Sequence, residues 1–312
     1  MKPVIYIDGQ EGTTGLQIYQ RLGARTDIEL LSIDPDKRKD KAERKKLINA
    51  ADLVFLCLPD AAAIEAVSLV ENPAVRVIDA STAHRTNPDW TYGYSELSAS
   101  QKEAIISTKR LANPGCHATG FISPVAPLVQ AGLIPADCPL TCYSLTGYSG
   151  GGKGMIADYE AGEVDEKLRS PRIYGLTLSH KHLPEMQAVC GLTRAPVFCP
   201  VVDDYYKGMA TSVMLHNQLL PGSPTAQDIW EVLKKHYEGC ALVSVAEFGY
   251  DEPMIAANTF AGKDTLQLIV CGGPERTLVT ALFDNLGKGA SGAAVQNMNL
   301  MLGFEETCGL SL

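Results

Sequence analysis

The first third of the chain alternates short apolar runs with helix-like segments. Each run is apolar at nearly every position, which is typical of strands buried on both faces of a parallel sheet. The expected strands are residues 4–8, 28–33, 53–58 and 75–79. The expected helices between them are residues 15–22, 40–51 and 61–70. This alternation predicts an α/β domain with a doubly wound parallel sheet of the Rossmann type.

The pattern changes after Cys116, where longer strand-like runs and glycine-rich turns predominate. Here the expected strands are residues 140–145, 195–202, 209–215 and 265–271. A helix is expected at 225–237, and one long final helix at 278–302 closes the chain. These features predict a second, α+β domain with a mixed sheet, which begins near residue 117.

Composition narrows the range of functions. The 312 residues are 46% hydrophobic and 20% charged, so the chain can bury a core, and its length predicts about two domains. The formal net charge of −9 argues against nucleic acid as the main partner. No apolar run approaches the roughly 18 residues of a membrane span, so we expect no membrane partner.

Cysteine usage points to a reducing compartment. The nine cysteines include no CxxC pair and no paired metal-ligand spacing, and their number is odd. A disulfide framework and a zinc site are therefore both disfavoured, and we expect no metal. Met1 leads directly into the first expected strand without the features of a signal peptide. We expect a cytoplasmic protein.

One cysteine lies in a tight turn, Asn113–Pro114–Gly115–Cys116, ahead of a helix-like run at 120–130. At the start of a helix, N–H groups and the helix dipole favour the thiolate, which is the attacking species. The same turn can donate N–H groups to an oxyanion. Cys116 is therefore a candidate nucleophile, and the alternative is a small buried residue, as most cysteines are.

Three glycines, Gly9, Gly12 and Gly15, lie between the first expected strand and helix. They permit a tight turn and the close approach of a pyrophosphate to the helix start, where Thr13 and Thr14 add hydroxyl donors. The alternative is a glycine-rich turn without a ligand. After the second strand, Asp34 suits the 2′-hydroxyl of NAD, whereas the basic residues 37–39 suit the 2′-phosphate of NADP or are simply solvated.

The segment 180–185 holds two of the six histidines, His180 and His182, and ends in Glu185. In an extended segment the two rings share a face, so one could serve Cys116 as acid or base while Glu185 or the other ring positions it. His117 competes for the same role, and two surface histidines are the alternative.

Several groups could bind an anion. Ser149, Gly150 and Lys153 belong to a glycine-rich loop that ends in a cation, and Arg85 follows the strand at 75–79. We group Asn113 with them as a substrate contact. A structural turn and a surface ion pair are the alternatives.

These features occur in motifs that together resemble the shorter form of N-acetyl-gamma-glutamyl-phosphate reductase, a family of the semialdehyde dehydrogenase superfamily. The motifs are DGQEGTTG at 8–15, DAST at 79–82 with Arg85, YGYSEL at 92–97, NPGCHAT at 113–119, SGGGK at 149–153, HKHLPE at 180–185 and KGASGAAVQNMNLM at 288–301. They follow the family order over nearly the whole chain. His117, Ala80 and His84 depart from the pattern of the longer form.

The resemblance implies reduction of N-acetylglutamyl 5-phosphate to the semialdehyde with NADPH, in arginine biosynthesis, through a thioester on Cys116. It implies His180 or His182 as the acid/base, pyrophosphate contacts at the glycine loop, and Asn297 at the nicotinamide amide. It also implies an NADP-binding domain of residues 1–116 with 286–312, a catalytic and oligomerisation domain of residues 117–285, and a homodimer or homotetramer.

Three other functions remain open. Aspartate-semialdehyde dehydrogenase uses the same chemistry on a shorter acyl phosphate, but normally places its histidine in a different context. A reductase of a carrier-linked acyl phosphate in lysine synthesis would be expected to have a more basic surface, whereas this chain has a formal net charge of −9. A non-catalytic dinucleotide-binding regulator would keep the glycine loop and need no activated thiol.

Overall fold

The computed structural model describes residues 2–312, which form two compact units. The first unit contains the chain up to Pro114 together with Ala290–Leu310, and the second contains Gly115–Gly289 with Ser311–Leu312. Among the described residues no helix is both long and apolar enough to cross a membrane.

The first unit is built on a six-stranded, all-parallel sheet with the strand order β2-β1-β3-β4-β6-β5. Its strands are β1 (Val4–Asp8), β2 (Glu29–Leu31), β3 (Leu53–Leu56), β4 (Arg76–Asp79), β5 (Thr91–Tyr92) and β6 (Arg110–Ala112). The chain passes from β1 to β2 on one side and then returns to β3 on the other. In such a sheet, ligands bind at the carboxyl ends of the strands, at the point where the strand order reverses, here between β1 and β3.

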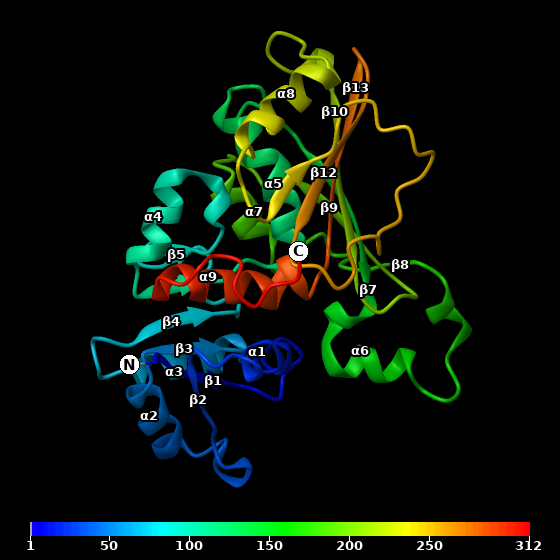
Figure 1. Cartoon of the computed structure of the whole chain (residues 1–312). Helices are drawn as coiled ribbons and strands as arrows, with labels where there is room; N and C mark the ends of the chain where they lie inside the picture. Colours follow the sequence, from blue (N-terminus) through cyan, green and yellow to red (C-terminus); the bar gives the residue numbers. More distant parts are fainter. Residues whose placement is uncertain (1) are drawn as a thin grey trace. The chain divides into compact units, whose positions relative to one another are not determined.

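Helices cover both faces of this sheet, as Figure 1 shows. Alternate residues of β1 serve the two faces, because Ile5 and Ile7 pack in one core cluster and Tyr6 packs in the other. The helices on the first face are α1 (Thr13–Gly23), α4 (Ala99–Ser107) and α9 (Gly292–Leu302), and those on the second are α2 (Lys41–Ala50) and α3 (Asp60–Ser68). The predicted Rossmann-type domain is confirmed.

The second unit contains a mixed seven-stranded sheet with the order β11-β12-β13-β10-β7-β9-β8. Its strands are β7 (Thr141–Gly147), β8 (Arg172–Ile173), β9 (Val197–Asp203), β10 (Met209–His216), β11 (Val243–Val245), β12 (Leu266–Gly272) and β13 (Arg276–Phe283). Its helices are α5 (Cys116–Gln130), α6 (Gly152–Tyr159), α7 (Leu183–Val189) and α8 (Ala226–His236). Helix α5 packs against β10 and β13 and is flanked by α7 and α8. The predicted mixed sheet is confirmed.

The predicted final helix at 278–302 is wrong. Residues up to Phe283 belong to β13, which pairs antiparallel with β10 on one side and β12 on the other. A short π-helical turn, Gly287–Ser291, follows, and only then does α9 begin at Gly292. A central strand that is buried on both faces is a continuous apolar run, which hydrophobicity alone does not distinguish from a buried helix.

Candidate active site

Cys116 is the first residue of α5, so the helix begins one turn earlier than the run at 120–130 predicted. Its N-cap, Gly115, has an extended backbone with φ −81° and ψ 148°. The first N–H groups of a helix have no partner within the helix, and for this reason helix N-termini are suited to bind anions. Cys116 is half-buried, whereas Gly115 and His117 on either side are buried. The thiol is therefore accessible at the positive end of the helix dipole.

Two neighbours hold this turn in place. The Gly115 N–H donates a hydrogen bond of 3.1 Å to Oε2 of Glu185, a residue of α7 that is only 1% exposed. Gly289 packs against the other side, where an added Cβ would lie 3.0 Å from the Cβ of Cys116. The start of α5 is thus held by a buried carboxylate and by a closely packed glycine, where an added Cβ would crowd Cys116.

Three histidines gather beside this turn. The ring of His117 lies 5.6 Å from that of His180 and 5.8 Å from that of His182, and the last two are 4.8 Å apart. Phe198 of β9 packs 5.1 Å from both His117 and His180. Two histidines that the sequence singled out are therefore brought together with the competitor, His117, in one cluster of the second unit.

The protonation of His180 follows from its surroundings. Burial, and secondarily the charge of Lys181, lowers the pKa of His180 to about 4, so the ring is neutral at pH 7. Its Nδ1 accepts a hydrogen bond of 3.2 Å from the His182 N–H, which places the single proton on Nε2. His180 therefore offers an N–H donor. His182 is 5% exposed and forms the N-cap of α7.

His117 has a different environment. Its Nδ1 is 2.8 Å from Ser144 Oγ and its Nε2 is 2.6 Å from the hydroxyl of Tyr174, so both ring nitrogens are engaged. Burial lowers the pKa of His117 to about 3, with smaller effects of His180 and Lys181. These contacts argue against His117 as the acid/base. Tyr174 was not among the sequence candidates, because no motif in its neighbourhood marks it.

The glycine loop of the first unit has the geometry that a pyrophosphate requires. Gly9 has φ +87°, and a Cβ there would collide with the carbonyl of Cys57 just beyond β3. A Cβ at Gly15 would collide with the Gly9 carbonyl, to which the Gly12 N–H donates at 3.0 Å. Helix α1 begins at the next residue, Thr13, with Thr14 behind it and no acidic residue in its first turn. The cradle therefore fits a dinucleotide phosphate.

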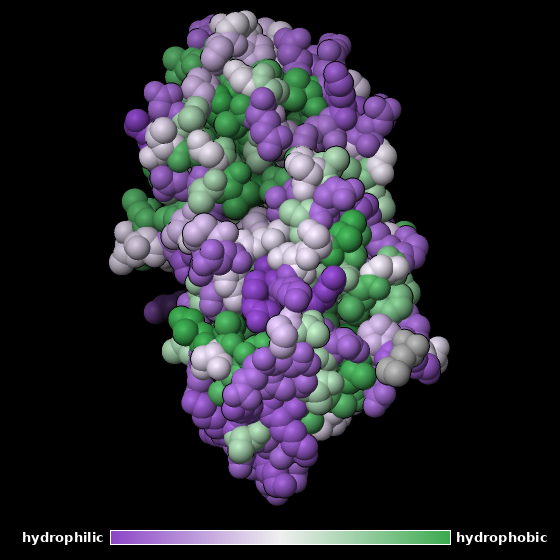
Figure 2. Space-filling model, turned by 90° about the vertical axis from the view of Figure 1, so that its left-hand side faces the viewer, coloured by the Kyte–Doolittle hydropathy of each residue, from purple (hydrophilic) through white to green (hydrophobic). Residues whose placement is uncertain are grey.

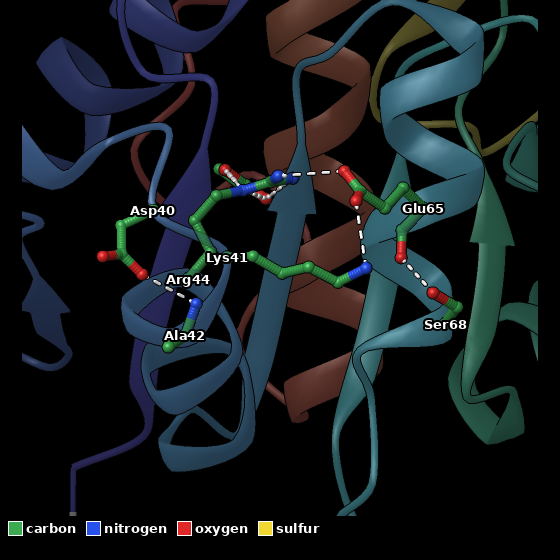
Figure 3. A network of polar contacts seen from close by, with 7 residues as sticks. Asp40, Lys41, Ala42, Arg44, Glu65 and Ser68 are labelled. Carbon is green, nitrogen blue, oxygen red and sulfur yellow. Dashed lines mark hydrogen bonds and ion pairs between the residues drawn. The ribbon is translucent and has the colours of Figure 1, made fainter.

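A charged network lies behind this loop. Asp8, the last residue of β1, makes a buried ion pair of 2.8 Å with Arg44 of α2. Arg44 also contacts Glu65 of α3 at 3.4 Å, and Glu65 pairs with Lys41 at 3.2 Å (Figure 3). The network ties α2 and α3 to the end of β1, where the glycine loop starts. Figure 2 shows hydrophilic side chains gathered at the lower end of the view, where Figure 1 places α2.

The residues after β2 are the candidates to contact the 2′-hydroxyl or 2′-phosphate of a dinucleotide. The Asp34 carboxylate accepts a hydrogen bond of 3.0 Å from the Asp36 N–H and so caps the short helix Pro35–Lys37. Lys37, Arg38 and Lys39 are exposed, and Arg38 lies 3.8 Å from Glu11 of the glycine loop. Asp34 is exposed as well, and its second oxygen is not used by the cap, so this segment presents both a carboxylate and three cations to solvent.

Asn297 of α9 supplies a further contact in the first unit. Its Nδ2 donates to the Gly93 carbonyl at 2.8 Å and to Asn113 Oδ1 at 3.2 Å, which fixes the orientation of the amide. Its buried Oδ1 has no hydrogen-bond partner within residues 2–312. A buried acceptor is normally satisfied, so this atom fits an amide N–H donor such as that of a nicotinamide.

Two of the expected substrate contacts, Arg85 and Asn113, make hydrogen bonds to backbone carbonyls of the protein itself. Arg85 donates to the carbonyls of Asn113 at 3.0 Å and of Ala80 at 3.1 Å, and Asn113 Nδ2 donates to the Ala290 carbonyl at 3.0 Å. Both residues therefore support the turn that leads to Cys116.

The glycine-rich loop of the second unit is held by a residue that the sequence did not reveal. Asn285 Nδ2 donates to Ser149 Oγ at 3.0 Å, and its Oδ1 accepts from the Gly208 N–H at 2.9 Å. Ser149 is 1% exposed, so this bond holds the loop in place from the inside. Gly150 and Lys153 are exposed.

Comparisons with known proteins agree with this architecture. Residues 116–285 match the family model "Semialdehyde dehydrogenase, dimerisation domain", and residues 20–105 match "Semialdehyde dehydrogenase, NAD binding domain". The chain therefore carries the nicotinamide dinucleotide-binding domain of semialdehyde dehydrogenases. A crystal structure of aspartate semialdehyde dehydrogenase II from Vibrio cholerae superposes with a TM-score of 0.74 over 97% of this chain and 99% of that one. At 15% identity this likeness shows the fold alone.

Relatives with higher identity identify the family. N-acetyl-gamma-glutamyl-phosphate reductase of Chelativorans sp. (strain BNC1) is 50% identical over 97% of this chain and 99% of its own length. N-acetyl-gamma-glutamyl-phosphate reductase 2 of Pseudomonas putida is 48% identical over 96% of this chain and 97% of its own length. The chain, with a cysteine at the start of a helix in one unit and a dinucleotide cradle in the other, belongs to the N-acetyl-gamma-glutamyl-phosphate reductase family.

Proposed function

We propose that this protein reduces N-acetyl-L-glutamyl 5-phosphate to N-acetyl-L-glutamate 5-semialdehyde with NADPH and releases phosphate, as a step of arginine biosynthesis. The names of its relatives support the substrate. The observation that carries the chemistry is the accessible Cys116 in the first turn of α5, with His180, His182 and Glu185 around it.

In the proposed mechanism the Cys116 thiolate attacks the acyl carbon. The N–H groups at the start of α5 stabilise the oxyanion that forms there. The bond from carbon to the phosphate oxygen breaks, phosphate leaves with the electron pair, and a thioester remains on Cys116. When bound, a reduced nicotinamide dinucleotide would supply a hydride to the thioester carbon, which would leave the anion of a hemithioacetal on Cys116. Cleavage of the C–S bond then returns the thiolate and frees the aldehyde.

The histidines divide the proton chemistry in this proposal. His180 presents Nε2–H and is suited to donate a hydrogen bond or proton to the substrate oxygen. His182 is then the candidate that accepts the thiol proton. General acid–base catalysis of this kind contributes about 10²–10⁴ in rate. Arg85, Asn113, Ser149, Gly150 and Lys153 are the proposed contacts to substrate and phosphate.

NADPH is the proposed cofactor because three consecutive cations, residues 37–39, follow β2 and suit a 2′-phosphate. One oxygen of the Asp34 carboxylate caps the helix Pro35–Lys37, and Asp34, Arg38 and the two lysine neighbours of Arg38 are all exposed. Gly9, Gly12, Thr13, Thr14 and Gly15 are the proposed pyrophosphate contacts, and Asn297 the nicotinamide contact.

The proposed assembly is a homodimer or homotetramer, which the description of the matched dimerisation domain supports. The proposed compartment is a reducing cytoplasm. Its support is the cysteine usage of the sequence, which is an odd number without CxxC pairs.

The test is a rate measurement in the reverse direction, in which NADP⁺ is reduced in the presence of the N-acetylated semialdehyde and phosphate. Wild-type protein should turn over, and Cys116→Ser should not, although it should still bind NADPH. Turnover by Cys116→Ser would contradict the thioester mechanism. Preference for aspartate semialdehyde would leave the mechanism intact and change the substrate.

A further inference from the structure

The ring of His180 is surrounded by four other rings of the second unit. Its centroid lies 5.6 Å from that of His117, 6.0 Å from that of Tyr174, 4.8 Å from that of His182 and 5.1 Å from that of Phe198. All four are inclined to it by 61–87°, which is the edge-to-face geometry that aromatic rings favour. They come from α5, from the residue after β8, from the N-cap of α7 and from β9. Contacts from four separate elements restrict the rotation of the His180 ring.

The backbone alone does not fix this ring. His180 lies between β8 and α7 in a segment that is neither helix nor strand, and its neighbours Ser179 and Lys181 are exposed. Within residues 2–312 the His180 ring takes part in one hydrogen bond, which its Nδ1 accepts from the His182 N–H. The length of 3.2 Å is at the upper end of the usual range. The orientation of the ring therefore depends on the side chains packed around it.

One of these neighbours, His117, is itself held at both ring nitrogens. Its Nδ1 lies 2.8 Å from Ser144 Oγ, and its Nε2 lies 2.6 Å from the hydroxyl of Tyr174. The His117 ring cannot turn about its Cβ–Cγ bond without breaking both contacts. Since Tyr174 also packs on His180, the second contact joins two of the four surrounding rings to each other.

The contact with Ser144 connects His117 to the sheet. Ser144 Oγ lies 2.7 Å from Thr211 Oγ1, and the two residues are direct partners in the register of β7 and β10. Both are 0% exposed, and Gly120 of α5 packs so closely on Thr211 that an added Cβ would collide with its hydroxyl. His117 therefore takes its position from the core of the unit, whereas His180 lies in a loop.

Burial also fixes the direction of these bonds. For the part of the chain that the structure describes, Thr211 Oγ1 has Ser144 as its one hydrogen-bonding neighbour. If Ser144 donated to Thr211, the Thr211 proton would be buried without an acceptor, which is strongly unfavourable. Thr211 therefore donates to Ser144, and Ser144 donates to His117 Nδ1. His117 then carries its proton on Nε2 and donates it to the Tyr174 oxygen.

We propose that His117 is a positioning residue, which holds the ring of His180 in its working orientation and is itself held by Ser144 and Thr211. His117 thus serves the reaction by packing, and does not exchange a proton. The inference rests on the proposed function, because it takes His180 as the residue that donates to the substrate oxygen.

The protonation states of the two rings agree with packing of this kind. Burial lowers the pKa of His117 to about 3 and that of His180 to about 4, so two neutral rings meet at pH 7. Neither ring repels the other, and His117 keeps the one tautomer that its hydrogen bonds require.

The first test compares the effect of Ser144→Ala in two backgrounds, the wild type and His180→Ala. Ser144→Ala removes the donor to His117 Nδ1, so the His117 ring can turn and no longer fixes His180. In the wild-type background kcat of the reverse reaction should fall by about 10–100-fold, since a displacement of about 1 Å costs about 10²-fold. In the His180→Ala background the same substitution should change kcat by less than about threefold, because no ring is left to position.

Ser212→Ala is the matched control. Ser212 is the next residue of β10 after Thr211, so its side chain points to the opposite face of the sheet. There its Oγ lies 2.9 Å from Oγ1 of Thr280 in β13. The variant breaks a similar contact between neighbouring strands on the face away from α5, so kcat should stay unchanged in both backgrounds.

The second test uses the wild-type protein, so it does not depend on the folding of a variant. NMR relaxation of histidine-labelled protein should show that the His180 ring is as rigid as that of His117. The ring of His216, which is exposed, should be mobile on the same timescale. The ¹⁵N shifts should show His117 neutral and protonated on Nε2 from pH 5 to 8.

Four results would overturn the inference: an equal fall of kcat in both backgrounds, no fall in the wild-type background, a His180 ring as mobile as that of His216, or an Nδ1–H tautomer of His117. Full kcat in His180→Ala would overturn it as well, because there would be no catalytic ring to position. None of these results would refute the thioester chemistry if Cys116→Ser is inactive. Conversely, activity in Cys116→Ser would refute the proposed function, whatever the mobility of His180.

Discussion

The hydrogen bond between Glu185 and the Gly115 N–H gives the sharpest test of how the nucleophile is positioned. Glu185→Ala removes the acceptor and leaves a buried N–H at the N-cap of α5 without its partner. A hydrogen bond to a charged group stabilises a fold by about 1.5–3 kcal/mol, so the free energy of unfolding should fall by that amount. Displacement of the turn by about 1 Å is enough to cost about 10²-fold in kcat.

Glu185→Gln separates this role from a role of the charge. Glutamine keeps an oxygen that accepts from the Gly115 N–H, so it should retain most of the stability that alanine loses. The measurements are chemical denaturation, kcat in the reverse reaction and the alkylation rate of Cys116. Full kcat and full stability in Glu185→Ala would refute the positioning role. If both variants lost kcat equally but only Glu185→Ala lost stability, the effect on catalysis would be assigned to the negative charge of Glu185.

Three further perturbations test other parts of the structure. In the fold, the pKa of His180 is lowered to about 4 and that of His117 to about 3, so both rings are neutral. Below pH 6.5 the unfolded chain binds protons that the folded protein does not, so the stability that these rings contribute is complete above pH 6.5 and is lost as the pH falls from 6.5 through the folded pKa values. Denaturation curves should therefore show that the free energy of unfolding decreases from pH 7 to pH 4. An equally large decrease in a His117→Gln variant would contradict this explanation. Arg44→Ala should destabilise the protein by about 3–5 kcal/mol, because Asp8 stays buried without its partner, and adding Asp8→Asn should recover part of the loss in thermal unfolding. Arg38→Ala should raise the KM for NADPH at least about tenfold and leave the KM for NADH unchanged, whereas equal effects on both would remove Arg38 from the 2′-phosphate site.

Local sequence patterns were sufficient to predict the Rossmann-type unit and its glycine loop. The strands β1, β3 and β4 are buried on both faces, and their apolar runs begin and end within a few residues of the observed strands. The loop after β1 is recognisable because the turn requires glycine at Gly9, where φ is positive. Such features depend on neighbouring residues and are therefore visible in the sequence.

Features that depend on contacts between distant segments could not be predicted in this way. Strand β13 resembles a helix in the sequence, and only its pairing with β10 and β12 distinguishes it. The bond between Thr211 and Ser144 depends on the register of β10 and β7, and Asn285 reaches Ser149 from beyond β13. Tyr174 becomes relevant only once His117 is placed beside it.

Mass spectrometry of the protein during turnover tests the central claim most directly. Acid quenching of a reaction that contains the N-acetylated semialdehyde, NADP⁺ and limiting phosphate should trap the acyl group as a thioester on the peptide that contains Cys116. Cys116→Ser should yield no such adduct. Protein that turns over at the full rate but never carries an acyl group on Cys116 would contradict the account.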